Sequence, residues 1–240
     1  MVVKCLILAS GFGTRLYPLT RDKAKALIEY NGKPLLTHIV ERIPQNINIF
    51  VATNRKFEMD FRCWQKGIDR KIEIGVEDVW TEKRKKGALG SLIFWVEQAN
   101  INEDLLILAS DNYFEFDLSR FISVYNGRNA LVAVHDIGDK DKAIQFGVVE
   151  IDEGKIVGCE EKPAFTKTSL VGIACYIFPP RLFAMLSRYH NEHPELDELG
   201  HFIAYLVKYD EVDAYIFTEL CQDIASIISG SGEVITSRGL

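Results

Sequence analysis

Short apolar runs alternate with stretches of helical spacing through the first 136 residues, and this alternation constrains the fold more than any other feature. The runs at 2–9 and 105–109 are almost free of charge, which is typical of strands buried on both faces. Further strand-like runs lie at 47–53, 72–76 and 130–135, and helical patterns lie at 34–43, 87–99 and 117–125. This β-α-β alternation predicts an α/β fold with a doubly wound, mainly parallel sheet.

After about residue 136 the pattern becomes mixed. Two apolar runs flank Asp152-Glu153-Gly154 and predict a hairpin. A strand at 170–178, a helix from Pro179-Pro180 to about Tyr189, a helix at 195–208 and a strand at 212–217 follow. We therefore expect a smaller mixed lobe packed on the parallel sheet, and a single domain of 240 residues with halves 1–136 and 137–240.

Membrane and secreted classes are disfavoured by the apolar segments. The longest nearly uncharged apolar run, at 170–180, has 11 residues, whereas a membrane helix needs roughly 20. The N-terminal run is too short for a signal peptide, so we expect a cytoplasmic protein. The five cysteines form no C-x-x-C pair, so we expect reduced thiols and neither disulfides nor zinc.

The charge distribution narrows the choice of ligand. The net charge of −6 disfavours a general nucleic-acid binder, which would be strongly basic. Residues 1–120 nevertheless carry 18 Lys and Arg against 16 Asp and Glu. This slight excess of positive charge in the first half is compatible with binding a small polyanion such as a nucleotide.

A glycine-containing turn follows the first strand and carries Gly11, Gly13 and Arg15. Glycines let backbone N–H groups converge on an anion, and a guanidinium binds phosphate in a bidentate manner. A Rossmann dinucleotide fingerprint would need a third glycine where Leu16 stands, and a Walker A loop would need Ser or Thr where Pro34 stands. Taken alone, these residues are also compatible with an ordinary glycine-containing turn that binds no ligand.

A longer ordered pattern extends this turn: Thr14-Arg15-Leu16-Tyr17-Pro18-Leu19-Thr20, then Lys25, then Gly32-Lys33-Pro34-Leu35-Leu36. It resembles the N-terminal signature of the sugar-phosphate nucleotidylyltransferases, the family of glucose-1-phosphate thymidylyltransferases and mannose-1-phosphate guanylyltransferases. Later segments are similar to the family in the same order: Gly87-Ala88-Leu89-Gly90, Leu106 to Asn112, Phe146-Gly147-Val148-Val149, Glu160-Glu161-Lys162-Pro163 and Asp223. The resemblance spans about residues 3–225 and implies a nucleotide-diphospho-sugar transferase fold of GT-A-like type.

The resemblance implies that a nucleoside triphosphate and a sugar-1-phosphate give a nucleotide-sugar and pyrophosphate. It assigns Arg15, Lys25 and Asp111 to catalysis, Arg15 holding the pyrophosphate and Lys25 neutralising phosphate at the reacting centre. It assigns the nucleotide to Ala9, Ser10, Gly11, Gly13, Thr14, Arg15 and Gly87. It assigns the sugar phosphate to Gly147, Glu161, Lys162 and Val171. It assigns Mg²⁺, a cation that prefers oxygen ligands, to Asp111 and Asp223.

Simpler interpretations of these residues stay open. Asp111 could cap a turn, Lys25 could be a solvated helix lysine, and Glu161 with Lys162 could be an exposed hairpin pair. The basic run at 83–86 is expected to be a solvated loop. His190 and His193 lack a third ligand, and Pro194 interrupts a continuing helix, which disfavours zinc.

The sequence also departs from the family pattern. Ala24 replaces a proline, Phe146 replaces a tyrosine, and Cys221-Gln222 stands where an aromatic residue usually precedes the late aspartate. We therefore expect Asp111 to be held rigidly after its strand and Asp223 to come from a looser loop, or to cap a helix beginning at Ile224. No residue near Gly87 matches the family residue that recognises the nucleotide base.

These departures leave the function with alternatives. We expect the catalytic core alone, without a C-terminal repeat domain, and the sequence leaves a homo-oligomer open. A non-catalytic regulatory paralogue that binds nucleotide-sugar is one alternative. A nucleotidyltransferase for another phosphorylated alcohol, such as phosphocholine, is another.

Overall fold

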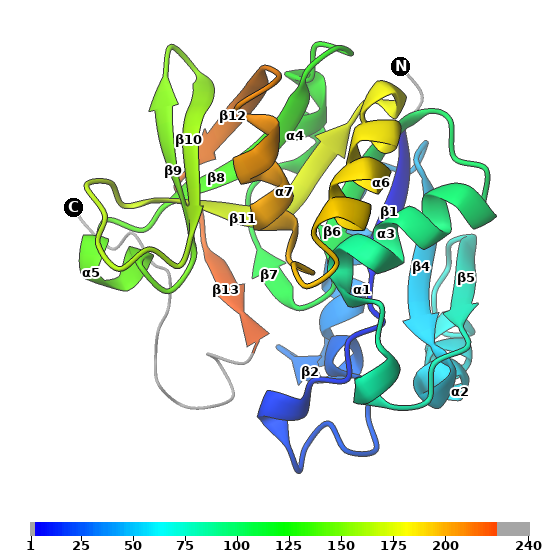
Figure 1. The fold of residues 1–240 in the computed structure, drawn as a ribbon. Helices are drawn as coiled ribbons and strands as arrows, with labels where there is room; N and C mark the ends of the chain where they lie inside the picture. Colours follow the sequence, from blue (N-terminus) through cyan, green and yellow to red (C-terminus); the bar gives the residue numbers. More distant parts are fainter. Residues whose placement is uncertain (1–2, 225–240) are drawn as a thin grey trace.

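The computed structural model describes residues 3–224, which form a nine-stranded sheet with helices on both faces (Figure 1). The strand order is β5 (Ile72–Glu77), β4 (Asn48–Asn54), β1 (Val3–Leu8), β6 (Asp104–Ala109), β11 (Leu170–Phe178), β8 (Ala130–Asp136), β12 (Val212–Phe217), β10 (Lys155–Glu161) and β9 (Gly147–Asp152). Strands β1, β4, β5, β6, β8 and β12 run in one direction, while β11 runs antiparallel between β6 and β8. The doubly wound, mainly parallel sheet is confirmed.

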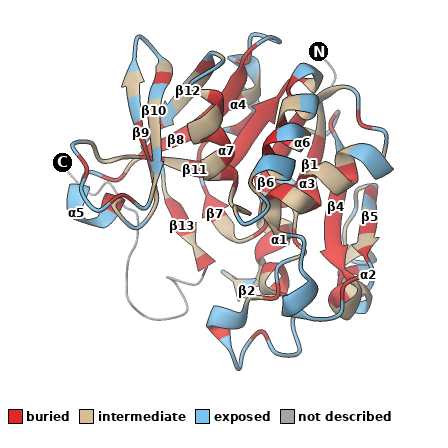
Figure 2. Cartoon of the chain, in the orientation of Figure 1, coloured by how far each residue is buried: buried red, intermediate tan, exposed pale blue. Residues whose placement is uncertain are grey.

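Each face of the sheet buries its own apolar layer because side chains alternate along a strand. Cys5 and Ile7 pack with α1 (Leu35–Arg42), α2 (Glu58–Gln65) and α4 (Leu118–Ser123). Leu6 faces the other layer, which contains α3 (Gly87–Gln98), α6 (Phe183–Glu192) and α7 (Leu199–Leu206). Most residues of the central strands are buried, as the red ribbons of Figure 2 show. Burying one large apolar side chain stabilises a fold by about 1.5–3 kcal/mol, so these two layers are its main support.

The mixed part expected after residue 136 is present and is continuous with the sheet. Strand β11 enters between β6 and β8, and the β9–β10 hairpin extends the sheet at its far edge. A short helix, α5 (Lys140–Ala143), precedes that hairpin. The described parts of the two predicted halves, on either side of residue 136, therefore contribute strands to one sheet.

Two predicted details differ from the structure. The helix expected at 195–208 begins only at Leu199, because Glu198 before it has an extended backbone conformation. Helix α2 and two small antiparallel ribbons were not predicted. The ribbons pair β2 (Glu29–Tyr30) with β3 (Lys33–Pro34), and β7 (Asn112–Phe114) with β13 (Cys221–Asp223).

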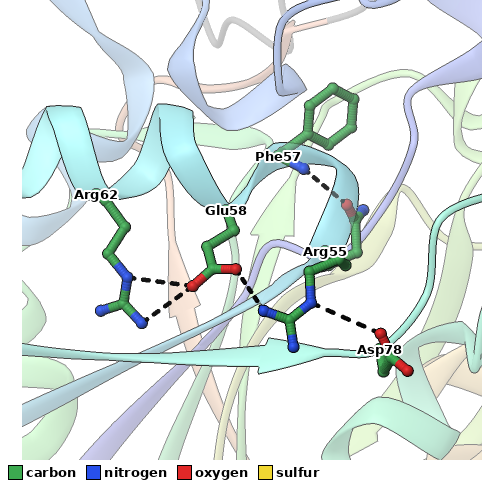
Figure 3. A network of polar contacts seen from close by, with 6 residues as sticks. Arg55, Phe57, Glu58, Arg62 and Asp78 are labelled. Carbon is green, nitrogen blue, oxygen red and sulfur yellow. Dashed lines mark hydrogen bonds and ion pairs between the residues drawn. The ribbon is translucent and has the colours of Figure 1, made fainter.

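A polar network holds the carboxyl ends of β4 and β5 together (Figure 3). Arg55 contacts Glu58 at 2.5 Å and Asp78 at 3.6 Å, and Arg62 contacts the same Glu58 at 3.3 Å. The backbone N–H of Phe57 donates to the Asn54 side chain at 3.1 Å. This end of the sheet therefore has a defined connection into α2.

None of the helices within residues 3–224 has the length and apolar character that a membrane span needs.

Candidate active site

The carboxyl ends of β1 and β6 border a cavity of about 720 Å³. Every residue that the sequence analysis assigns to binding, catalysis or metal lines it: Ala9, Ser10, Gly11, Gly13, Thr14, Arg15, Lys25, Gly87, Asp111, Gly147, Glu161, Lys162, Val171 and Asp223. Parallel α/β sheets bind ligands at this edge. The structure brings these residues together at one cavity, while their individual roles stay predictions.

The structure accounts for only one of the two glycines in the turn after β1. Gly13 has φ +63°, and a Cβ there would lie 3.1 Å from Thr20 Cγ2, so glycine is required. The Thr20 hydroxyl also donates a hydrogen bond to the Gly13 carbonyl at 2.6 Å. A Cβ on Gly11 would meet no atom within 4 Å, so packing within the described chain does not require glycine there.

Neighbouring elements anchor this turn. The Asn54 amide donates to the Ser10 carbonyl at 2.8 Å, and the Ala9 N–H donates to the Ala52 carbonyl at 2.8 Å. The Ser10 hydroxyl contacts the Ser91 hydroxyl at 3.3 Å. The turn is thus held by β4 on one side and α3 on the other, while Arg15 remains exposed towards the cavity.

Lys25 joins two carboxylates from distant parts of the chain. Its Nζ lies 2.9 Å from Asp111 Oδ2 and 3.2 Å from Asp223 Oδ2, and 18% of its side chain is exposed. Burial alone would lower the pKa of Lys25, but the two carboxylates outweigh it and the pKa is raised. Lys25 is therefore not a solvated helix lysine, and it is held as a cation at this point.

The β7–β13 ribbon brings Asp223 to Asp111. Asp223 pairs in register with Asn112, and the Ile224 N–H donates to the Asp111 carbonyl at 2.9 Å. The expectation of a looser loop is wrong, because Asp223 lies on a paired strand. The segment that Asp223 was expected to cap lies outside the described residues, apart from Ile224 itself.

The paired aspartates suit a hard divalent cation. Mg²⁺ is usually held by one or two protein carboxylates, with phosphate and water oxygens completing its ligands. Asp111 and Asp223 supply such oxygens at one point, and their side chains are 36% and 30% exposed, so a substrate can reach them. Among residues 3–224 no group of three His, Cys, Asp or Glu side chains could hold a metal, and the five cysteines form no disulfide.

The Glu161 carboxylate lies close to two glycines, Gly147 and Gly200. A Cβ on Gly147 would lie 2.8 Å from Glu161 Oε2, and a Cβ on Gly200 would lie 2.3 Å from the same atom. Burial and the neighbouring Glu198 raise the pKa of Glu161, with Lys162 acting against them. Only 14% of this side chain is exposed, so the interpretation as an exposed hairpin pair is wrong for Glu161.

Lys162 is bound by carboxylates in the same cavity. Its Nζ lies 2.9 Å from Glu198 Oε1 and 3.3 Å from Glu161 Oε1. Its backbone has φ +46°, and its N–H donates to the Phe146 carbonyl at 3.0 Å. Glu198 and Gly200 were not predicted, because neither belongs to a motif and both approach Glu161 only in the folded chain.

The segment around Gly87 packs against the loop that precedes α7. Gly87 has φ +72°, and a Cβ there would lie 2.3 Å from the Asp197 Cβ. The Leu89 N–H donates to the Asp197 carbonyl at 3.1 Å. The four residues of the adjoining basic run are all exposed, as the expectation of a solvated loop has it, and Lys85 also lines the cavity.

Comparisons with known proteins agree with this geometry. The profile described as nucleotidyl transferase matches residues 4–227. A Haloferax volcanii protein named UTP–glucose-1-phosphate uridylyltransferase is 31% identical over 186 residues, 75% of this chain and 74% of the relative. A Danio rerio protein named mannose-1-phosphate guanylyltransferase catalytic subunit beta is 30% identical over 196 residues, 78% of this chain and 51% of the relative.

Solved structures support the fold independently. A candidate glucose-1-phosphate thymidylyltransferase from Bacillus anthracis superposes with a TM-score of 0.81 at 22% identity, covering 96% of this chain and 93% of that one. A UDP-glucose pyrophosphorylase from Acinetobacter baumanii gives a TM-score of 0.76 at 20% identity, covering 95% and 90%. At these identities the likeness shows the fold alone. The chain spans about half the length of several of its curated relatives.

Proposed function

The chain belongs to the nucleotidyl transferase family, and on that premise we propose that it transfers a nucleotidyl group from a nucleoside triphosphate to a sugar-1-phosphate. The products are a nucleotide-sugar and pyrophosphate. The observation that carries the proposal is one cavity lined by Arg15 and Lys25 after β1, by the Asp111–Asp223 pair, and by Lys162 at the end of β10. The names of the relatives cover uridylyl, adenylyl and guanylyl transfer, so the proposal stands at the level of substrate class.

The reaction needs charge neutralisation and alignment more than a protein nucleophile. A phosphate oxygen of the sugar-1-phosphate attacks the α-phosphorus, a new P–O bond forms, and the bond to the β-phosphate oxygen breaks to release pyrophosphate. Both reactants are anions, so cations that hold them together lower the barrier most. No proton has to be removed from an ionised phosphate, which agrees with a site dominated by lysine and arginine.

Each cationic residue has a separate task in this scheme. The turn at Ser10–Thr14 binds the triphosphate through backbone N–H groups, and Arg15 holds the departing pyrophosphate. Lys25 faces the α-phosphate, where negative charge accumulates as the new bond forms. Lys162 grips the sugar phosphate, and the buried Glu161 carboxylate accepts hydrogen bonds from sugar hydroxyls.

Mg²⁺ fits the Asp111 and Asp223 oxygens and would supply further charge neutralisation at the phosphates. Lys25 contacts the same two carboxylates, so it keeps their charge compensated and their side chains in place. Arg15, Lys25, Asp111 and Lys162 all lie in the cavity, which favours catalysis over the non-catalytic alternative. The cytoplasmic location and any homo-oligomer stay predictions.

The test is pyrophosphate release by the purified chain across a matrix of nucleoside triphosphates and sugar-1-phosphates, with phosphocholine as a further acceptor. We expect at least one sugar-1-phosphate pair to react, only with a divalent cation, and to lose most of its rate in Asp111→Asn. Release with phosphocholine alone would favour the alternative acceptor. No release from any pair, with nucleotide-sugar still bound in calorimetry, would overturn the proposal in favour of a regulatory protein.

A further inference from the structure

The basic run Lys83 to Lys86 lies between β5 and α3, and its members have different surroundings. Lys86 lies over the ring of Phe94, with 4.4 Å from Nζ to the ring centroid. Lys83 and Arg84 are exposed and do not line the cavity. Lys85 is the member of this run that lines it, together with the glycine turn and Arg15.

Two carboxylates hold Lys85 at the cavity wall. Its Nζ lies 3.1 Å from Glu82 Oε1 and 3.8 Å from Asp197 Oδ2. The side chains are 46%, 38% and 42% exposed for Lys85, Glu82 and Asp197. Ion pairs this exposed are weak and screened by water, so an anionic ligand can replace them at little cost.

Arg15 and Lys85 form a pair of like charges facing one cavity. The pKa of Lys85 is raised, mainly by its hydrogen bond to Glu82, while Arg15 lies near enough to act in the opposite direction. Two neighbouring cations repel each other unless an anion lies between them. A triphosphate carries several negative charges, so it can compensate both at once, whereas a single carboxylate cannot.

We propose that Lys85 binds the triphosphate of the nucleotide together with Arg15, and that Asp197 competes with this triphosphate for Lys85. The inference rests on the proposed function and deepens it by adding a nucleotide-binding residue outside the glycine turn. It gives two substitutions opposite effects. Loss of the Lys85 charge weakens triphosphate binding, while loss of the Asp197 charge strengthens it by removing one of the two carboxylates that hold Lys85.

The chain offers matched controls for both changes. Lys83→Gln removes a lysine two positions away, which does not line the cavity. Glu195→Gln removes an exposed carboxylate from the same loop as Asp197, also outside the cavity. The double variant Lys85→Gln/Asp197→Asn distinguishes direct competition for Lys85 from a general effect of the Asp197 charge on the electrostatic potential of the cavity. Direct competition requires Lys85, so Asp197→Asn should have no effect once Lys85 is replaced.

The test measures binding of inorganic tripolyphosphate by calorimetry at low salt, and the KM for each substrate of the active pair. We expect Lys85→Gln to raise the tripolyphosphate Kd and the triphosphate KM about 10-fold, the loss typical of one charge-assisted contact. The KM for the sugar phosphate should change by less than about twofold, as should all constants in the two controls, since exposed charges are screened. Asp197→Asn should lower the Kd by about threefold, and this gain should vanish in the double variant.

Equal Kd values for Lys85→Gln and Lys83→Gln would overturn the assignment. A gain from Asp197→Asn that persists without Lys85 would overturn the competition. The binding measurement does not require turnover. A wild-type chain that releases no pyrophosphate therefore contradicts the proposed function, while a loss of tripolyphosphate affinity in Lys85→Gln still supports this inference.

Discussion

Replacing Lys25 with methionine removes the cation that joins Asp111 and Asp223 while keeping most of the side-chain volume. Breaking a fully buried ion pair costs about 3–5 kcal/mol. Here the carboxylates are 36% and 30% exposed, so water compensates part of the loss. We expect the free energy of unfolding to fall by about 1.5–3 kcal/mol. For a chain of this size that corresponds to a melting temperature lower by roughly 3–12 °C.

The same variant should also lose activity. Lys25 is proposed to face the α-phosphate, and the loss of one charged contact there lowers turnover about 10- to 150-fold. Thermal melts and pyrophosphate release measure the two effects, with Lys66→Met as the control because Lys66 is exposed on the far end of α2. An unchanged melting temperature together with a rate close to wild type would refute this role of Lys25.

Three further perturbations address other parts of the molecule. Gly147→Ala places a Cβ 2.8 Å from Glu161 Oε2, so the carboxylate must move and the KM for sugar phosphate, but not for triphosphate, should rise about 10-fold in steady-state kinetics; equal rises would contradict it. Asn54→Ala leaves the Ser10 carbonyl without its donor and should cost about 1–3 kcal/mol in urea unfolding, while an unchanged midpoint would argue against that anchor. Burial lowers the pKa of His135 below its usual 6.5, so the unfolded chain binds the proton more readily than the folded chain. The free energy of unfolding therefore decreases as the pH falls below 6.5 towards the pKa in the folded chain. His135→Phe should make this decrease smaller between about pH 7.5 and 5.5, and the same pH dependence in wild type and variant would contradict the prediction.

The elements of the sheet could be predicted because their signals are local. The uncharged runs of β1 and β6 need no partner to be recognised, and Gly13 indicates a turn through its own backbone freedom. Helix α2 buries only Phe61 fully, so its periodic signal is weak. The start of α7 was predicted too early for a different reason. A turn and irregular backbone stand in place of its expected first turn, and Asp197 and Glu198 in this segment contact Lys85 and Lys162, so its conformation depends on tertiary neighbours.

The same distinction holds in the site. Residues inside motifs, such as Arg15 and Lys162, could be placed in it from the amino-acid sequence alone. The partner of a motif residue could not, because Glu198 and Gly200 reach Glu161 only when α7 packs beside β10. Asp223 was expected beside Asp111 on a weak pattern, but its strand pairing with β7 has no local signal.

The central claim is that the sugar phosphate attacks the α-phosphorus in this cavity. The direct measurement uses a sugar-1-phosphate carrying oxygen-18 in its phosphate, the matching triphosphate, and mass spectrometry of the products. We predict that all of the label is found in the nucleotide-sugar and that the pyrophosphate is unlabelled. Label in the pyrophosphate, or unlabelled nucleoside monophosphate as the main nucleotide product, would contradict it.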